Sequence, residues 1–213
     1  EARLARCVQE LGWGHARTQS EAAALGSLRL RLGQHDAALE LAHRAASEAA
    51  QALGTESQWH HRQRQNQAAA LSASARFDES EAIYTQTIDF YRGTFGPDHQ
   101  LTLGASNNYG LMLVERGDGA RAEALLRDTL ARAMASGFAP MEAVLRRNLG
   151  RALDLLDRDD EALAELERAH ALSIERGEQE HASKAAQALA AFHQRRGRHA
   201  EAAAWSARAN AAP

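Results

Sequence analysis

The sequence predicts an all-α solenoid built from repeated helix pairs, and three observations lead to this prediction. Similar segments begin at Leu11, Leu53 and Phe95, at a constant spacing of 42 residues. Apolar side chains within these segments recur at helical rather than alternating positions. The composition, 45% hydrophobic but only 5% aromatic, offers an alanine and leucine core with little β-propensity. Self-similarity at such a period indicates an array in which each unit buries its apolar face against its neighbours.

The third segment shows how one unit is expected to form two helices. Between Leu101 and Arg116 the apolar residues, among them Leu103 and Val114, lie at helical spacing. The sequence Arg-Gly-Asp-Gly over 116–119 then ends this first helix, because glycine readily adopts the conformations of a turn. Helical spacing resumes over 120–133, which predicts the second helix.

Second helices are expected at the matching place in every unit. Each follows a turn marked by a small residue or an aspartate, at steps of 40 to 42 residues: Gly33, Ala75, Gly117, Asp157 and Gly197. Besides 120–133, these helices are predicted over 36–53, 78–95, 159–176 and 198–211. Asp36 and Asp78 stand at helix starts, where a carboxylate is expected to cap free backbone N–H groups and oppose the helix dipole.

The sequence is expected to form one repeat domain over residues 1–213, cut from a longer protein. Residues 1–11 align with the end of a second helix, so we interpret them as a remnant of a preceding repeat. The units then lie at about 12–53, 54–95, 96–136, 137–177 and 178–213. Apolar residues of the terminal helices are expected to lack a covering helix, and homodimers through these ends would follow: Leu4, Cys7, Val8, Leu11 and Trp205.

Five segments of turn and second helix resemble the tetratricopeptide repeat: GQHDAALELAHRA, ARFDESEAIYTQT, GDGARAEALLRDT, DRDDEALAELERA and GRHAEAAAWSARA. The resemblance places small residues at two tight helix contacts in each: Ala38 and Ala45, Ser80 and Thr87, Ala122 and Thr129, Ala162 and Ala169, Ala202 and Ala209. The long unit is more similar to kinesin light chain repeats and their bacterial variants. The resemblance implies a right-handed superhelix of antiparallel helix pairs, acting as the interaction part of a larger bacterial signalling protein.

Composition narrows the expected partners. The net charge is −3, from 25 basic and 28 acidic residues, which implies no general attraction to nucleic acid or an anionic membrane. No apolar stretch approaches the roughly 18 residues of a spanning helix, and no signal peptide is visible. The single cysteine, Cys7, excludes an intramolecular disulfide framework. We therefore expect a cytoplasmic protein with a protein or peptide partner.

The resemblance implies a concave groove lined by the first helices. The groove-facing residues expected from it are Arg62, Gln65, Asn66, Asn107, Asn108, Arg147, Asn148, Arg151 and Lys184. Of these, Asn66, Asn108 and Asn148 occupy one equivalent position in successive units. An amide presents both a donor and an acceptor, which suits the backbone of an extended peptide. Alternatively, these asparagines hydrogen-bond only to the neighbouring repeat.

Three cations are expected to gather at the C-terminal end of this groove. Arg147, Arg151 and Lys184 could hold a carboxylate, an acidic side chain or a phosphate, so an acidic partner is favoured. The alternative is that the two arginines pair with Asp154 and Asp157 on a solvated face. Asn148 and Lys184 match two positions of the carboxylate clamp by which some tetratricopeptide domains hold acidic chaperone tails. The resemblance is incomplete, because Asn107, Leu111 and Ala188 stand where the clamp has Lys, Asn and Arg.

The sequence gives no pattern for catalysis, a cofactor or a metal. His60 and His61 are adjacent, so on a helix they point about 100° apart and cannot chelate one ion as an i, i+4 pair can. No nucleophile elbow, P-loop or dinucleotide motif is present. The predicted function is a non-catalytic scaffold that binds an extended peptide or partner segment. Self-association is the alternative, and a histidine-dependent hydrolase is a third hypothesis.

Overall fold

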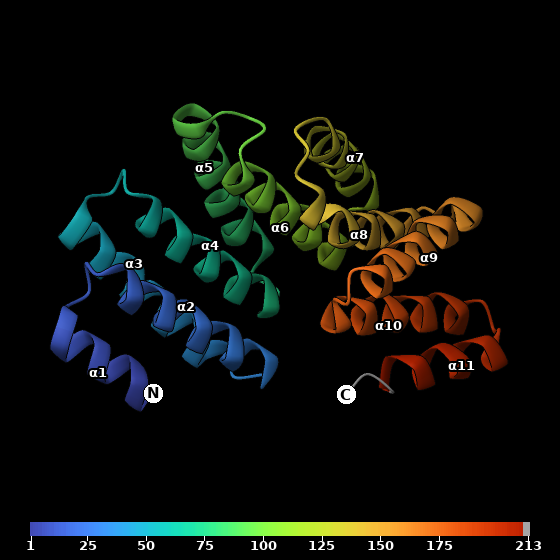
Figure 1. Cartoon of the computed structure of the whole chain (residues 1–213), viewed down its shortest axis with the longest axis horizontal. Coiled ribbons are helices and arrows are strands. Elements are labelled where there is room, and N and C mark those ends of the chain that lie inside the picture. The colour runs from blue at the N-terminus through green and yellow to red at the C-terminus, as the bar shows by residue number, and fades with distance from the viewer. Residues whose placement is uncertain (211–213) are drawn as a thin grey trace. The chain divides into compact units, whose positions relative to one another are not determined.

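The computed structural model describes residues 1–210, which form eleven α-helices and one short 3-10 helix (Figure 1). Within these residues the chain is all-α, as the sequence predicts. The helices in chain order are α1 (Ala2–Leu11), α2 (Ala16–Arg31), α3 (His35–Leu53), α4 (Gln58–Ala73), α5 (Phe77–Phe95), α6 (Gln100–Arg116), α7 (Gly119–Ala135), η1 (Ala139–Met141), α8 (Glu142–Leu155), α9 (Asp159–Glu175), α10 (Gln179–Arg195) and α11 (His199–Asn210). Residue 211, the predicted end of the last helix, lies outside the described residues.

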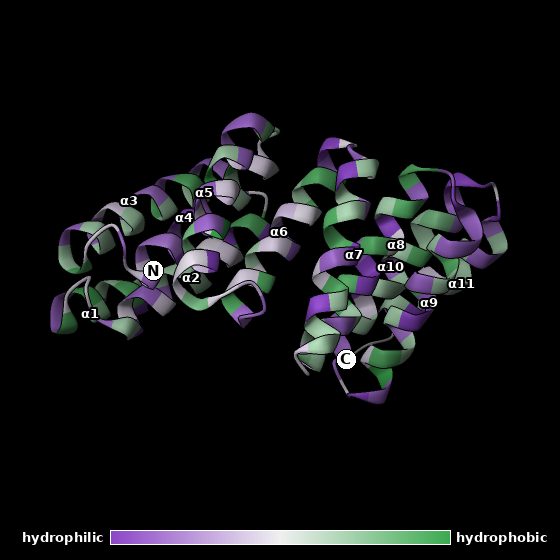
Figure 2. Ribbon diagram, turned by 90° about the horizontal axis from the view of Figure 1, so that it is seen from above, coloured by the Kyte–Doolittle hydropathy of each residue, from purple (hydrophilic) through white to green (hydrophobic). Residues whose placement is uncertain are grey.

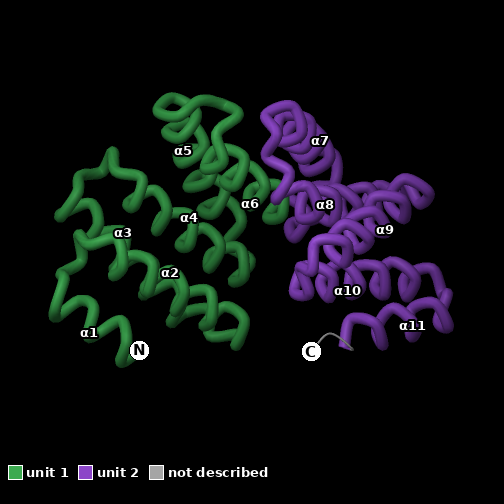
Figure 3. The backbone as a smooth tube through the Cα atoms, viewed as in Figure 1, with its two compact units in different colours: residues 1–112 green, residues 113–213 purple. Residues whose placement is uncertain are grey.

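The helices follow one another as pairs within two compact units, residues 1–112 and 113–213 (Figure 3). In the first unit α1 packs on α2, α2 on α3, α3 on α4 and α4 on α5. In the second unit α7 packs on α8, α8 on α9, α9 on α10 and α10 on α11. First helices also contact the next first helix along the chain, α2 with α4 and α8 with α10. Side chains on neighbouring first helices can therefore share one surface.

The five predicted turns have one common backbone geometry. Gly33, Ala75, Gly117, Asp157 and Gly197 all have φ between 55° and 87°. The residue after each turn donates its backbone N–H to the carbonyl five residues earlier, as from Arg76 to Leu71 at 2.9 Å and from Asp118 to Leu113 at 2.9 Å. This six-residue hydrogen bond and the left-handed residue together form a Schellman motif, which satisfies carbonyls at the end of the first helix.

The expected position of two aspartates at the helix caps is wrong. The helices begin one residue earlier than predicted, so Gln34 and Arg76 occupy the N-cap positions of α3 and α5, without a side-chain cap. Asp36 and Asp78 lie instead in the first turn, where a carboxylate still opposes the positive end of the helix dipole. The turn, rather than the side chain of the N-cap residue, fixes where α3 and α5 start.

Two glycine substitutions should have opposite effects on stability. A Cβ at Gly117 or at Gly104 would meet no atom within 4 Å, so neither substitution causes a clash with neighbouring residues. Gly117→Ala places alanine at a φ of 87°, which should lower the free energy of unfolding by about 1 kcal/mol. Gly104→Ala lies inside α6 and should raise it by up to about 1 kcal/mol. Urea unfolding followed by circular dichroism measures both, and shifts of the same sign would contradict this account of the turn.

The predicted small residues lie at close helix contacts. All ten are buried, with at most 6% of their surface exposed: Ala38, Ala45, Ser80, Thr87, Ala122, Thr129, Ala162, Ala169, Ala202 and Ala209. The hydroxyl of Ser80 on α5 donates to the carbonyl of Ala68 on α4 at 2.8 Å, which shows how near the two backbones are. Short side chains are required where helix axes approach closely. Figure 2 shows that polar and apolar residues share individual helices.

None of the helices in residues 1–210 combines the length and hydropathy that a membrane span requires.

Candidate peptide-binding surface

The nine predicted groove residues lie on first helices of both compact units. The first unit carries Arg62, Gln65 and Asn66 on α4 and Asn107 and Asn108 on α6. The second unit carries Arg147, Asn148 and Arg151 on α8 and Lys184 on α10. We call the four amides of the first unit, Gln65, Asn66, Asn107 and Asn108, the amide row. We call Arg147 and Arg151 the arginine face.

The amide row is tied together across repeats. The Nδ2 of Asn108 donates to Oε1 of Gln65 at 3.4 Å, which joins α6 to α4. Gln65 donates in turn from Nε2 to the hydroxyl of Tyr91 on α5 at 3.2 Å. Asn107 donates from Nδ2 to Oδ1 of Asn108 at 3.3 Å. The contact to the neighbouring repeat thus exists for Asn108, although this exposed amide retains capacity for a further hydrogen bond.

A second amide chain runs into the core, and sequence reasoning missed it. Asn66 donates to Oε1 of Gln63 at 2.9 Å. The Nε2 of Gln63 donates to both Oε1 and the backbone carbonyl of Gln19, each at 2.9 Å, and Gln19 donates to the carbonyl of Trp13 at 2.7 Å. Gln19 and Gln63 are almost fully buried, and burial of an amide requires such partners. The sequence does contain a signal for this chain: a glutamine on the buried face of each of two first helices, Gln19 on α2 and Gln63 on α4.

The three equivalent asparagines differ in their surroundings. Asn66 is half-buried, Asn108 is exposed and Asn148 is completely buried. The Oδ1 of Asn148 accepts hydrogen bonds from Nε and Nη2 of Arg147 at 3.3 and 3.2 Å. The asparagines are therefore not equally available to a ligand, even though they hold the same position in their repeats.

The arginine face holds two positive charges in poorly solvated places. Arg147 and Arg151 lie one turn apart on α8, and both are half-buried. Burial lowers the pKa of Arg147 to about 10, and the charge of Arg151 adds to this effect, while Glu180 opposes it. Burial also lowers the pKa of Arg151, against the opposing charge of Glu115. Both guanidinium groups stay protonated at neutral pH, so burial leaves two cations that have lost part of their hydration.

Within residues 1–210 neither arginine of this face takes part in an ion pair. The alternative interpretation, in which they pair with Asp154 and Asp157, is therefore not observed. Asp154 is buried instead between Arg195 and Arg196, the latter at 2.7 Å.

Other cations nearby are paired. Arg146, also on α8, bonds to Glu142 at 2.9 Å and to Glu165 at 2.8 Å. Lys184 is exposed and pairs with Glu180 at 2.7 Å. The arginine face differs from both because neither of its arginines forms a salt bridge among the described residues, and perturbed charged groups of this kind are typical of functional sites.

The cluster around Asp154 links three helices of the second unit. Arg196 pairs with Asp154 at the end of α8 and, through a very short contact, with Asp159 at the start of α9. Its guanidinium carbon lies 3.7 Å from the ring centroid of Phe192, so the arginine also makes a cation–π contact. Sequence reasoning did not foresee this cluster, because its members come from residues far apart in the chain.

The two adjacent histidines have separate surroundings. Nδ1 of His60 lies 2.9 Å from the carbonyl oxygen of Ala46. The ring of His61 stacks on Phe90 with 3.8 Å between centroids, and burial lowers the pKa of His61 to about 4. In the described part of the chain, no three histidine, cysteine, aspartate or glutamate residues converge as a metal site would need.

The terminal helices bury part of their apolar surface. Cys7 is buried against α2, where the hydroxyl of Thr18 donates to its carbonyl at 3.2 Å, whereas Leu11 is 39% exposed. Trp205 on α11 is half-buried, with its ring centroid 5.0 Å from that of His170. The guanidinium carbon of Arg208 lies 4.4 Å from the Trp205 ring. Aromatic and cationic neighbours thus cover part of this tryptophan.

An all-α array of helix pairs with polar side chains on its first helices is typical of non-catalytic protein–protein interaction scaffolds. The tetratricopeptide repeat family matches residues 59–135 and 101–175, which together are more than half of the chain. The protein therefore belongs to the tetratricopeptide repeat family.

Solved structures agree with this assignment and support the resemblance to kinesin light chain repeats. BtubC (BKLC) from P. vanneervenii has a TM-score of 0.70 and 20% identity, over 98% of this chain and 87% of that chain. The kinesin light chain TPR-like repeats from Podosopora anserina give 0.65 and 20%, over 92% and 95%. MamA 41-end from Desulfovibrio magneticus RS-1 gives 0.54 and 18%, over 90% and 92%. At these identities the likeness establishes the fold alone. No curated protein sequence matches the chain.

Proposed function

We propose that this protein is an interaction scaffold whose arginine face binds an acidic segment of a partner protein. The observation that carries the proposal is that Arg147 and Arg151 are half-buried and that neither forms a salt bridge within residues 1–210. The resemblance to long bacterial repeats favours a role as the interaction part of a larger signalling protein.

The energetics favour a carboxylate ligand at this position. Folding has already removed much of the water around the two guanidinium groups, so an arriving anion loses less by displacing the remainder. A guanidinium can bind a carboxylate through two parallel charge-assisted hydrogen bonds. Because the arginines are four residues apart on one helix, they can contact neighbouring acidic residues of an extended segment.

The proposal is tested by peptide binding to a double variant. Arg147→Gln with Arg151→Gln should weaken binding of a fluorescent glutamate-rich peptide by more than about tenfold, because each lost charge-assisted bond contributes 1 kcal/mol or more. Lys184→Gln should have a smaller effect, since Lys184 is exposed and already paired with Glu180. Fluorescence anisotropy measures the affinities, and thermal unfolding shows whether each variant keeps its fold.

A matched control removes the same charge elsewhere. Arg121→Gln with Arg168→Gln lowers the net charge equally, on exposed positions of the second helices α7 and α9. This variant should bind the acidic peptide within about twofold of the parent. Equal weakening by both double variants would mean that net charge alone attracts the peptide, and the arginine face would lose its assigned role.

Self-association is the second candidate, favoured by the exposure of Leu11 and the half-buried ring of Trp205. Light scattering over a range of protein concentrations separates the two proposals. A constant monomer mass together with peptide binding supports the scaffold, whereas a mass that doubles without any peptide affinity supports self-association.

A further inference from the structure

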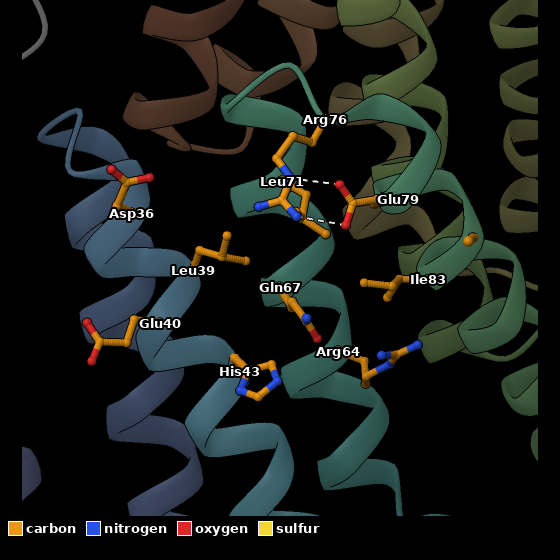
Figure 4. Close-up of a pocket in the computed structure, with 11 residues that line it drawn as sticks. Asp36, Leu39, Glu40, His43, Arg64, Gln67, Leu71, Arg76, Glu79 and Ile83 are labelled. Carbon is orange, nitrogen blue, oxygen red and sulfur yellow. Dashed lines mark hydrogen bonds and ion pairs between the residues drawn. The ribbon is translucent and has the colours of Figure 1, made fainter.

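A pocket of about 620 Å³ lies between the second helices α3 and α5 in the first unit (Figure 4). Leu39 of α3, Leu71 of α4 and Ile83 of α5 give it an apolar floor, and Leu71 and Ile83 are buried. Its volume lies within the roughly 300–1,000 Å³ that is usual for ligand pockets. The residues of this α3–α5 pocket are distinct from those of the amide row.

On the polar rim of the α3–α5 pocket the arginines have hydrogen-bond partners in the described part of the chain, whereas two carboxylates do not. Arg76 is held by Glu79 through two bonds of 2.7 Å, and Arg64 donates to Gln86 at 2.7 Å. On the opposite wall Asp36 and Glu40 lie one turn apart on α3, and both are exposed. Neither takes part in a hydrogen bond or ion pair within residues 1–210. The pocket therefore combines an apolar floor, occupied cations and two available carboxylates.

The second unit contains the equivalent seam, between α7 and α9, and there ion pairs between side chains span it. Arg158 and Glu161 correspond to Arg76 and Glu79 and form the same pair, at 2.7 Å. Glu123 of α7 accepts from Arg158 at 2.6 Å and from Arg127 at 2.8 Å, and Arg127 also reaches Glu161 at 3.0 Å. These four residues form a closed ring of charges between α7 and α9.

Two substitutions between repeats leave the seam in the first unit without this ring. Counted from the preceding turn, Leu39 stands where α7 has Glu123, and His43 stands where α7 has Arg127. The first unit therefore keeps one ion pair of the ring, Arg76 with Glu79, and lacks both the central carboxylate and the second arginine. In their place are an apolar floor and unpaired acids on the rim.

We propose that the α3–α5 pocket binds an arginine-containing aliphatic segment of a partner protein. The stem of the arginine packs on Leu39 and Ile83, and its guanidinium bonds to Asp36 and Glu40. The partner thereby supplies the cation that Arg127 supplies within the chain in the second unit. Burying an aliphatic stem while pairing its charged end is how arginine covers apolar surface in proteins. The site selects a basic segment, whereas the arginine face selects an acidic one.

The test uses three short helical peptides that differ only at the central residue. Each carries leucine four residues before and after that position, which is arginine, glutamine or glutamate. Anisotropy of the labelled peptides should show the arginine peptide binding more than about tenfold tighter than the glutamine peptide, with the glutamate peptide weakest. Equal affinity for the three peptides, or no detectable binding of the arginine peptide, overturns the proposal.

A closing variant locates the binding. Leu39→Glu with His43→Arg rebuilds the ring of the second unit, so it should keep or raise the melting temperature and lose affinity for the arginine peptide by more than about tenfold. Asp36→Asn with Glu40→Gln changes only exposed side chains, so its fold is safe, and it should also lose about tenfold. Parent-like affinity in either variant refutes the assignment.

The closing variant also keeps this proposal separate from the proposed function. It should bind the glutamate-rich peptide as the parent does, since that peptide is assigned to the arginine face. If the closing variant instead abolishes a concentration-dependent increase in the mass of the protein alone, the occupant is a second copy and the assignment to a partner is wrong.

Discussion

Gly150→Ala should destabilise the second unit by about 2–3 kcal/mol, because it adds a methyl group where α8 lies close against α9. A Cβ at this position would lie 2.7 Å from Cγ and 2.9 Å from Cδ2 of Leu166. It would also lie 3.0 Å from the backbone carbonyl oxygen of Ala162, which cannot move without shifting the helix. Urea unfolding followed by circular dichroism measures the change in unfolding free energy.

Two controls isolate the contact as the cause. Gly26→Ala lies inside α2, where a Cβ would meet no atom within 4 Å, so it should be neutral or stabilising by up to about 1 kcal/mol. Gly150→Ala combined with Leu166→Ala should be less destabilising than the sum of the two single changes, because the second removes the atoms that the first strikes. Strict additivity would show that this contact is not responsible.

Asp154→Ala should lower the unfolding free energy by about 3–5 kcal/mol, the usual cost of removing one partner from a buried ion pair. The Asp154 side chain is only 2% exposed and lies between Arg195 and Arg196. Without it, Arg196 stays largely buried, with 14% of its side chain exposed, and Asp159 remains as its salt-bridge partner. Thermal and urea unfolding of the variant measure the loss.

The matched control removes an aspartate from an exposed pair in the same unit. Asp128 bonds to Arg132 at 2.8 Å, with 59% of its side chain exposed. Asp128→Ala should cost no more than about 1 kcal/mol, because solvent screens such pairs. Similar costs for the two alanine variants would mean that the cluster around Asp154 contributes no more than a surface pair.

The sequence by itself determined the helices, their pairing and the turns between them. The predicted helices 101–116 and 159–176 differ from the observed α6 and α9 by one residue at one end. All five landmark residues prove to be left-handed turn residues, although two of them are not glycine. These features are local or periodic. Helical spacing, turn chemistry and small residues at contacts recur in each repeat, so the same prediction could be made several times from different segments.

Only the tertiary structure decided which polar side chains meet and which do not. Three asparagines at one repeat position range from exposed to completely buried, because their neighbours differ in size and polarity from unit to unit. Asp154 pairs with Arg195 and Arg196 rather than with Arg151 and Arg147, one and two turns before it, which leaves those two arginines without a salt bridge within residues 1–210. In the same way, whether ion pairs span the seam beside Leu39 depends on four side chains: Leu39 and His43 on α3, and Arg76 and Glu79 at the start of α5. Ion pairs and pockets depend on distances of a few ångströms between segments far apart in the chain, and the repeat period constrains the backbone but not the side chains that fill it.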